Sequence, residues 1–292
     1  MSVRIVIWLV ALLASVGVAT YLCTLFWKKG AFFEANGVRL HYVEAGHGTP
    51  VILVHGLGAN HVGNWMLPRV FQRLARRYRV IALDNRGHGK SDKPYDPAQY
   101  GLELVEDVVR LMDHLGIAKA HVVGYSLGGF ITLKLALRHP ERLLSAAPCG
   151  AGWSANPAEE LKLLYSLSDD LEQGRGIMAL LKWLQAPKKA LPTPALWFIN
   201  RMTCLLNDIK ALSCLLRNSP ALVATESEVR GNVVPCLAVV GGNDHMEVFA
   251  QQMAAAMPNL ELLVIPGCDH FTTLLSRKIT PALMTFLDRH TP

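Results

Sequence analysis

From about residue 31 onward, short apolar stretches rich in β-branched residues alternate with longer stretches that have helical spacing. Continuously apolar strands are typical of a sheet buried on both faces, and helices between strands are typical of parallel pairing. The pattern therefore predicts an α/β fold with a mostly parallel, doubly wound sheet. The predicted strands lie near 39–45 and at 51–55, 79–84, 120–125, 237–242 and 260–266, with a weaker one at 143–150. The predicted helices lie at roughly 66–77, 101–115, 127–138, 246–257 and 274–289.

Residues 153–230 interrupt this alternation, because they carry helical spacing and no convincing strand. We expect an inserted helical unit between two strands of a core formed by residues 31–152 and 231–292. Most of its large apolar side chains are expected to pack within the unit. Two further roles stay open for some of them: lining a pocket above the sheet, or lying against a membrane.

The N-terminal stretch from 5 to 27 contains no charged residue and is long enough to cross a bilayer as a helix. Residues 1–30 are therefore predicted to be a single-pass transmembrane anchor that attaches the protein to a membrane. A cleaved signal sequence, which would make the protein secreted or periplasmic, is the main alternative, and a buried soluble helix is another. The apolar run is long for a signal sequence, and Gly17-Val18-Ala19 is a poor cleavage site. The flanking charges nearly balance, so the sidedness stays open.

The formal net charge of +6 is mild, and half of it comes from Arg4, Lys28 and Lys29 around the apolar stretch. The basic run RLARRYR at 73–79 is interpreted as the exposed face of an amphipathic helix followed by the start of a strand. No zinc-finger spacing or interleaving of aromatic and basic residues accompanies it, so we expect no nucleic-acid partner.

Five cysteines follow the N-terminal apolar stretch, and none of them has CxxC spacing. The sequence therefore indicates neither a metal site nor a complete set of disulfides. One bridge, between Cys204 and Cys214, stays open for an oxidising compartment. Most of the cysteines are expected to be small, buried hydrophobic side chains.

The segment GYSLGG at 124–129 places Ser126 between an apolar strand and a helix. In this G-x-S-x-G arrangement, a tight strand-to-helix turn presents the serine hydroxyl above the sheet edge and requires small neighbours. Gly124, Gly128 and Gly129 meet that requirement. The helix that follows supplies free N–H groups and positive potential. Ser126 is therefore the candidate nucleophile.

A serine hydroxyl needs a general base, and the base needs an orienting carboxylate. Both should follow later strands, because open α/β sheets bind their ligands at the carboxyl ends of the strands. His270 follows the last predicted strand, and Asp244 follows the strand before it. We assign His270 as the base and Asp244 as the orienting acid, in preference to His245, His290 and Asp269.

Acyl transfer also needs two backbone N–H groups that bind the oxyanion. One is expected to be the N–H of Leu127, directly after the nucleophile. The other is expected from the glycine-rich loop HGLG at 55–58. Leu57 N–H is the first choice there, and Gly58 N–H is the alternative.

Taken together, these motifs resemble those of the α/β-hydrolase fold superfamily over about residues 31–290. HGLG is similar to the oxyanion loop of the family and GYSLGG to its nucleophile turn. GGNDH at 241–245 is similar to the acid turn, and GCDHF at 267–271 is similar to the histidine turn. The order Ser, Asp, His is also that of the family. The resemblance implies that residues 153–230 form the helical cap that the family carries at this place.

One further segment supports the resemblance, and one residue departs from it. DNRGHGKSD at 84–92 is similar to the family element D-x-R-G-x-G-x-S. The resemblance implies that Asp84, Arg86 and His88 are structural and have no catalytic role. Asp269 departs from the family pattern, in which glycine usually precedes the histidine, and it places a carboxylate beside the imidazole.

The assigned residues and the resemblance imply a serine hydrolase that cleaves a carboxylic ester through an acyl-enzyme. Ser126 would attack the carbonyl while His270 takes its proton and Asp244 holds the imidazole. The reaction needs no metal and no cofactor. The apolar cap and the anchor favour an apolar acyl group, such as that of a lipid ester.

The same three residues leave other functions open. Hydrolysis of a carbon–carbon bond in a dienoate-type ketone and cofactor-free perhydrolysis use the same catalytic groups. A non-catalytic, membrane-tethered binding protein is a remote alternative, because such proteins usually lose one of the three residues. Epoxide and haloalkane hydrolysis are disfavoured, since relatives with those activities carry Asp at the nucleophile position. The substrate-contacting residues and the oligomeric state stay open.

Overall fold

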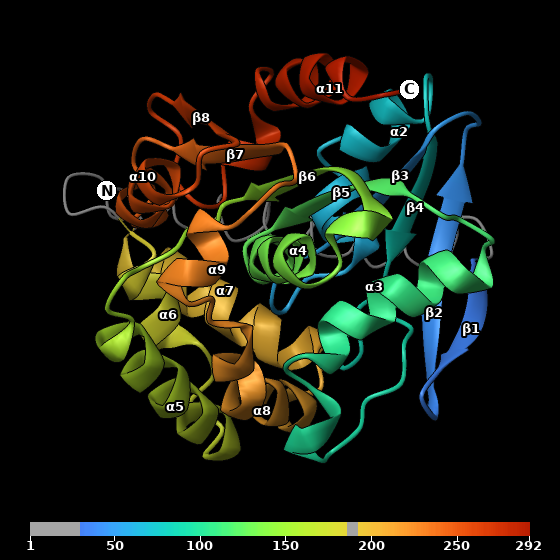
Figure 1. The fold of residues 1–292 in the computed structure, drawn as a ribbon. Helices are drawn as coiled ribbons and strands as arrows, with labels where there is room; N and C mark the ends of the chain where they lie inside the picture. The colour runs from blue at the N-terminus through green and yellow to red at the C-terminus, as the bar shows by residue number, and fades with distance from the viewer. Residues whose placement is uncertain (1–29, 186–191) are drawn as a thin grey trace, which may run out of the picture.

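The computed structural model describes residues 30–185 and 192–292, and one eight-stranded sheet forms its centre (Figure 1). The strands are β1 Ala31–Ala35, β2 Val38–Ala45, β3 Pro50–Val54, β4 Arg79–Leu83, β5 Ala120–Tyr125, β6 Leu143–Cys149, β7 Cys236–Gly241 and β8 Leu260–Ile265. They lie in the order β1-β2-β4-β3-β5-β6-β7-β8. Only the β1–β2 and β2–β4 pairs are antiparallel, and all pairs from β4 to β8 are parallel. The predicted mostly parallel, doubly wound α/β sheet is therefore confirmed.

The edge strand β1 was not among the strands predicted from the sequence. Asn36 and Gly37 have positive φ angles of 51° and 76°, so they form the two-residue turn that folds β1 back on β2. An Asn-Gly pair between two strands is a strong hairpin signal. In β1, however, only Phe33 and Ala35 are buried. This short alternating pattern does not stand out beside the continuously apolar inner strands.

Helices cover both faces of the sheet. Figure 1 shows α2 Val70–Leu74 and α11 Ile279–Arg289 above it, and α3 Glu103–His114 and α4 Leu127–Arg138 below it. Alternate residues of the central strand β3 divide between the two sides: Val51 and Leu53 pack with α2 and α11, whereas Ile52 and Val54 pack with α3 and α4. The apolar strands are thus buried on both faces, as their composition indicates.

Two predicted helices are shorter than expected. The helix predicted at 66–77 is a π-helical turn, Val62–Met66, followed by the short α2. Arg69 lies between them with φ of 64°, which is a left-handed conformation that interrupts a helix. The helix predicted at 274–289 begins only at Ile279, after a separate 3₁₀ turn at Thr273–Leu275.

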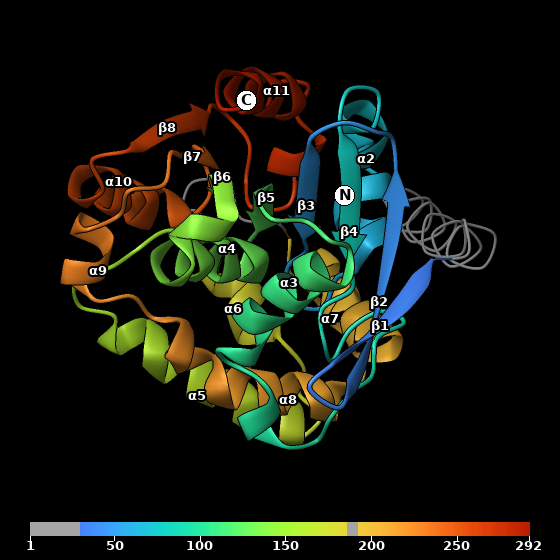
Figure 2. The ribbon, with the colours of Figure 1, turned by 45° about the vertical axis from the view of Figure 1, so that its right-hand side comes forward.

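Residues 153–230, called the helical segment below, lie between β6 and β7. Their helices are α5 Ala158–Glu172, α6 Met178–Trp183, α7 Thr193–Leu206, α8 Ile209–Asn218 and α9 Glu226–Arg230, followed in the chain by β7 and by α10 Met246–Ala256 (Figure 2). In the described part of this segment, 153–185 and 192–230, there is no strand, although Gln185 forms an isolated bridge with Asp244. Trp153 Nε1 donates to Ala224 O at 2.9 Å and ties the two ends of the segment together.

The predicted anchor at 5–27 lies outside the described residues. Within 30–185 and 192–292, no helix combines the length and the apolar character needed to cross a membrane.

Each cysteine in the described part of the chain is a free thiol: Cys149, Cys204, Cys214, Cys236 and Cys268. The Cys204–Cys214 bridge that the sequence left open is therefore absent. Burial raises the pKa of Cys149 and of Cys236 to about 12, so these two thiols stay protonated at neutral pH. These two behave as small buried hydrophobic side chains. The expectation that most of the cysteines are buried is wrong, because Cys204, Cys214 and Cys268 are only partly buried.

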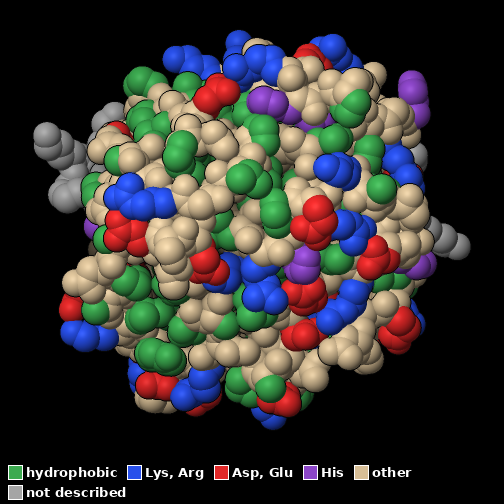
Figure 3. Space-filling model, in the orientation of Figure 1, with side chains coloured by type: hydrophobic (Ala, Val, Ile, Leu, Met, Phe, Trp, Pro, Cys, Tyr) green, Lys and Arg blue, Asp and Glu red, His purple; other side chains and the backbone are tan. Residues whose placement is uncertain are grey.

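The basic run at 73–79 combines buried apolar side chains with arginines that are partly or fully exposed. Leu74 and Tyr78 are buried. Arg77 pairs with Asp288 at 2.9 Å, and Arg79 pairs with Glu44 at 2.7 Å. On the face of the molecule seen in Figure 3, basic and acidic side chains are likewise interspersed.

Arg86, in the turn after β4, is fully buried and joins three parts of the core. Its guanidinium makes two 2.6 Å bonds to the buried carboxylate of Asp107 on α3. It also donates to Gln99 O at 2.6 Å and to Ala35 O, at the end of β1, at 3.4 Å. The bidentate geometry is the strong form of an arginine–carboxylate pair. This turn therefore has the structural role that the sequence implies for it.

We expect Arg86→Leu to lower the free energy of unfolding by about 3–5 kcal/mol, because it leaves the Asp107 carboxylate buried without its main partner. The double variant Arg86→Leu/Asp107→Leu removes both charges and should be more stable than Arg86→Leu alone. Urea denaturation of the four proteins of this cycle measures the coupling. Simple additivity of the two single effects would contradict this account of the turn.

Candidate active site

The turn that carries Ser126 is strained and tightly packed. Ser126 has φ of 56° and ψ of −120°, a backbone conformation that residues other than glycine rarely adopt. Helix α4 begins at the next residue. A Cβ on Gly124 would lie 1.9 Å from Gly128 O, and a Cβ on Gly128 would lie 2.0 Å from Val54 O. The glycines around Ser126 are therefore required by contact with the neighbouring backbone. The turn presents the Ser126 side chain to a cavity between the sheet domain and the helical segment.

His270 and Asp244, from the loops after β8 and β7, form a buried pair. His270 Nδ1 lies 2.8 Å from Asp244 Oδ2, and the other carboxylate oxygen accepts from Met246 N at 2.9 Å. The two residues are 5% and 3% exposed, so the pair is shielded from water. The Tyr125 hydroxyl donates to His270 O. Because Tyr125 directly precedes Ser126, this bond brings the histidine loop to the serine turn.

The side chains rejected as base or acid from the sequence have other surroundings. The His245 ring packs against Trp183 and Phe249, with ring centroids 4.5 and 5.7 Å away. The Asp269 carboxylate accepts from the backbone N–H groups of Phe271 and Thr272 at 2.9 and 2.8 Å. Asp269 thus shapes the histidine loop.

The two preferred backbone donors, Leu57 N–H and Leu127 N–H, follow β3 and β5 and are not used in the hydrogen bonds of the described residues. The alternative donor, Gly58 N–H, is already used, because it donates to His88 Nε2 at 3.1 Å. Burial, together with the neighbouring His55, lowers the pKa of His88 to about 3, so this nitrogen stays free to accept. The alternative assignment to Gly58 is therefore not supported.

Buried histidines hold this loop, and sequence reasoning gave them no such role. His88 Nδ1 lies 3.1 Å from Arg86 O, which orients the ring so that Nε2 faces Gly58. His55 Nδ1 lies 2.8 Å from Gly56 O, and its Nε2 accepts from Asn85 N at 3.0 Å. In the sequence, His88 stands between two glycines and His55 precedes one, but no spacing indicates their partners, which come from distant loops.

The cavity beside Ser126 is almost entirely apolar. Its walls come from the α4 N-terminus, α10 and the helical segment, and include Phe130, Trp153, Leu164, Trp183 and Leu216. Among the described residues that line it there is no Lys, Arg or His, and its one ionisable side chain is Glu160. The residues of these walls are candidates for contact with the substrate, an assignment that the sequence left open. The cavity suits an apolar group and offers no cation for a carboxylate.

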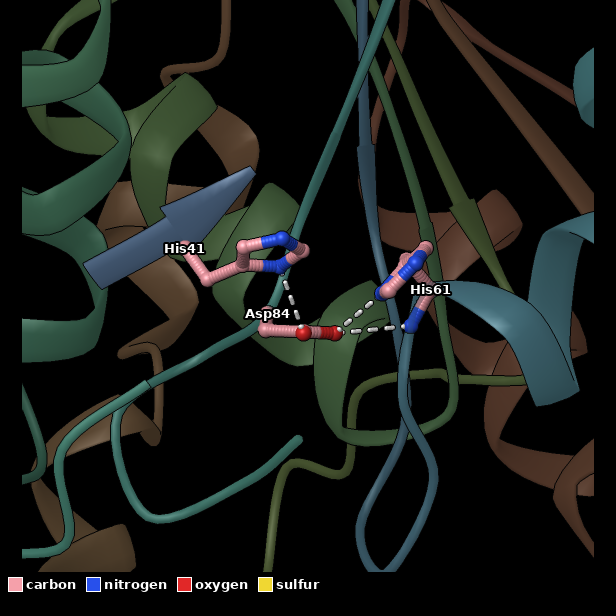
Figure 4. A group of neighbouring side chains, drawn as sticks. All are labelled: His41, His61 and Asp84. Atoms are coloured by element: carbon pink, nitrogen blue, oxygen red, sulfur yellow. Dashed lines mark hydrogen bonds and ion pairs between the residues drawn. The ribbon is translucent and has the colours of Figure 1, made fainter. Parts of the chain in front are cut away.

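A cluster of His41, His61 and Asp84 is the one group of described residues whose side chains could jointly face a metal ion (Figure 4). Asp84 Oδ1 accepts from His61 N and His61 Nδ1 at 2.9 and 2.8 Å. Asp84 Oδ2 accepts from His41 Nδ1 and Lys90 N at 2.9 and 3.1 Å. Both carboxylate oxygens and both Nδ1 atoms are thus used in hydrogen bonds, whereas the buried His41 Nε2 has no partner among the described residues. The cluster is a buried carboxylate satisfied by N–H donors and gives no reason to assign a metal.

Chemically, the arrangement combines a strained serine and two free backbone N–H groups at an apolar cavity with an imidazole that a carboxylate orients. Nucleophilic attack on a carbonyl carbon requires groups of these kinds. Within the described residues His270 is bonded to Asp244 and makes no hydrogen bond to Ser126.

Comparison with known proteins gives consistent matches. A profile of the family described as "alpha/beta hydrolase fold" matches residues 49–276. The dihydrolipoyllysine-residue acetyltransferase component of the acetoin cleaving system of Pseudomonas putida is 31% identical over 269 residues, which cover 88% of this chain and 69% of that protein. The 2-hydroxy-6-oxononadienedioate/2-hydroxy-6-oxononatrienedioate hydrolase of Comamonas testosteroni is 32% identical over 255 residues, which cover 81% of this chain and 86% of that protein. The structure of a thermophilic esterase from Thermogutta terrifontis has a TM-score of 0.74 at 21% identity, covering 91% of this chain and 99% of that one, which shows a shared fold.

The buried Asp84 makes stability depend on pH. Burial alone would raise the pKa of Asp84, but the hydrogen bonds from His41 and His61 outweigh burial and hold it well below its usual range. A lowered folded-state pKa stabilises the protein above the unfolded-state pKa of about 4, and this stabilisation is lost as the pH falls further. We expect Asp84→Asn to cost about 2–4 kcal/mol at neutral pH, because an amide turns N–H groups toward N–H donors.

The difference between Asp84→Asn and the wild type should shrink below about pH 4, where the wild type loses the same stabilisation. Urea denaturation across the acid range measures this convergence. Asp113→Asn, which alters an exposed pair with Arg142, is the control and should change stability by less than about 1 kcal/mol. A constant difference at all pH values would refute the role assigned to the Asp84 charge.

Proposed function

The chain belongs to the α/β-hydrolase fold family, and on that premise we propose that it is a serine hydrolase that cleaves carboxylic esters with an apolar acyl group. The observation that carries the proposal is the placement of Ser126 on the wall of an apolar cavity, next to the Tyr125 side chain that binds the His270 loop. The buried bond between His270 and Asp244 supports the assignment of base and orienting acid.

In the proposed mechanism, Ser126 Oγ attacks the ester carbonyl and His270 Nε2 takes the hydroxyl proton. Asp244 accepts from Nδ1–H, which leaves Nε2 as the acceptor and stabilises the imidazolium that forms. Leu57 N–H and Leu127 N–H donate to the tetrahedral oxyanion. His270 then protonates the leaving alcohol. Water, deprotonated by His270, attacks the acyl-enzyme and releases the carboxylic acid, so the reaction needs no cofactor.

The helical segment is proposed to act as the cap of the site. Its residues Trp153, Leu164, Trp183 and Leu216 form walls of the cavity beside Ser126. An acyl chain that enters this cavity exchanges water for apolar contacts, which favours binding by about 0.8 kcal/mol for each buried methylene group. The cap is therefore proposed to determine acyl-chain preference.

Hydrolysis of a carbon–carbon bond is the second candidate, because the Comamonas testosteroni relative is named as a hydrolase of a dienedioate. A dioate carries two carboxylates, and a carboxylate buried in this cavity would lack a cation and would meet Glu160. The cavity therefore favours the ester proposal over a dioate substrate. Perhydrolysis uses the same catalytic groups, and no contact in the site selects for it.

Attachment to a membrane through residues 5–27 is proposed from the sequence and fits the choice of an apolar substrate. On the described surface, α7 exposes Trp197, Leu205 and Leu206 and contains no acidic residue. A helix with exposed Trp and Leu and no acidic side chain is suited to the interface of a bilayer. A lipid ester is accordingly the proposed natural class of substrate.

A fluorophosphonate probe tests the nucleophile. We expect the full-length protein to be labelled on Ser126, and Ser126→Ala to lose the label and to lower kcat for p-nitrophenyl esters by about 10⁴-fold or more. Ser227→Ala, which changes an exposed serine on α9, should keep both the probe labelling and the ester hydrolysis of the wild type. Labelling that persists in Ser126→Ala, or a wild type that neither labels nor cleaves any ester, would overturn the proposal.

A chain-length series tests the apolar cavity. We expect kcat/KM for p-nitrophenyl octanoate to exceed that for the acetate by about 100-fold, since several methylene groups are removed from water. Leu164→Asn, in the cavity wall, should reduce the octanoate value and leave the acetate value nearly unchanged. Faster turnover of short, polar esters than of medium-chain esters would exclude the proposed acyl preference.

A further inference from the structure

The loop after β3 is fixed from the core at three consecutive peptide groups. His55 Nδ1 lies 2.8 Å from Gly56 O, so it orients the peptide whose N–H belongs to Leu57. Gly58 N–H donates to His88 Nε2 at 3.1 Å, which orients the next peptide. Gly56 N–H is also bound, to Asn64 Oδ1 at 2.7 Å. The core thus sets the direction of Leu57 N–H from one side of the loop.

The next peptide of this loop, whose carbonyl belongs to Gly58, is held from the helical segment. Asn207, the residue directly after α7, donates from Nδ2 to Gly58 O at 3.1 Å, across 149 positions of sequence. The same amide group donates to Thr203 O at 3.0 Å, which keeps it on the end of the helix. Gly58 has φ of 66°, and a Cβ there would lie 3.0 Å from Thr203 Cγ2. The end of α7 therefore sits directly on the loop.

The junction that carries Asn207 is itself anchored. Asp208, the next residue, accepts from Ala211 N at 3.1 Å and caps the start of α8. Its other carboxylate oxygen accepts from the Tyr95 hydroxyl at 2.7 Å, from the loop before α3. The position of the Asn207 amide is thus set by how the α7–α8 junction is seated on the core.

We infer that Asn207 is a positioning residue for oxyanion binding: by holding Gly58 O, it makes the alignment of Leu57 N–H depend on the seating of the helical segment. The inference rests on the proposed serine hydrolase function. It adds to that function a second role for the segment, which takes part in transition-state binding as well as enclosing the acyl group. An interaction that acts on the oxyanion affects kcat more than KM, because the oxyanion is absent from the bound ester.

Steady-state kinetics on p-nitrophenyl octanoate test this role. We expect Asn207→Ala to lower kcat about fivefold, as for loss of one hydrogen bond, with KM nearly unchanged. Asn207→Asp places carboxylate oxygens against Gly58 O and should lower kcat about tenfold or more. The matched control is Asn200→Ala, on the same helix, because the bonds of Asn200 to described residues go to Ile177 N and Arg175 O, both within the helical segment. Its kcat should stay within about twofold of the wild type.

A pair of inhibitors separates positioning from a general structural effect. An octyl trifluoromethyl ketone forms a tetrahedral adduct with the serine and carries an oxyanion, whereas the octyl methyl ketone fills the cavity without forming one. In Asn207→Ala and Asn207→Asp, affinity for the trifluoromethyl ketone should fall in parallel with kcat, and affinity for the methyl ketone should stay constant. This combination would support the inference.

The opposite results would overturn it. Unchanged kcat in both Asn207 variants, an equal loss of affinity for the two ketones, or the same kcat loss in Asn200→Ala would each show that Asn207 does not act on the oxyanion. These outcomes would leave the serine hydrolase proposal intact, provided that the wild type is labelled by the fluorophosphonate probe and cleaves the ester. A wild type that does neither would overturn both proposals.

Discussion

The close approach of backbone segments around Ser126 is the constraint on which the rest of the site depends. Gly124 and Gly128 have no space for a side chain, because the carbonyl groups of Gly128 and Val54 lie within 2.0 Å of where a Cβ would be. Ser126 N–H donates to Cys149 O at 2.9 Å, so the turn is also tied to β6. These contacts hold the left-handed Ser126 in place, and they require β3, β5 and β6 to be neighbours in the sheet.

The loops around this turn are held by buried polar side chains. Asp84, Arg86 and His88 lie within five positions of each other. Asp84 and His88 hold the segment after β3, at His61 and Gly58, and Arg86 holds α3 through Asp107. Their burial has a cost that only complete hydrogen bonding offsets, which makes the turn after β4 rigid. A rigid frame is what an oxyanion site needs, since its donors must be aligned before the charge develops.

Much of this could be predicted because it is encoded locally. Apolar runs identified seven of the eight strands, and the position of Ser126, Asp244 and His270 after strands followed from the geometry of open α/β sheets. The features that were missed depend on partners far away in sequence. The use of Gly58 N–H by His88, and the contact of Asn207 with Gly58, come from folding of separate loops, and no spacing rule relates positions 58 and 207. The left-handed Arg69 lacks a residue-type signal altogether.

The described parts of the helical segment contact both the cavity and the loop that carries Leu57. Leu164 and Trp183 belong to the cavity walls, while Asn207 reaches the loop that carries Leu57. The segment is also attached to the acid loop, because Gln185 bridges to Asp244. In the proposed enzyme, a substrate that packs well against the walls would therefore stabilise the same arrangement that aligns both the proposed oxyanion donor and the proposed acid. Substrates that fill the cavity poorly forgo this stabilisation. Discrimination between acyl groups should consequently extend beyond ground-state binding into the rate of the chemical step.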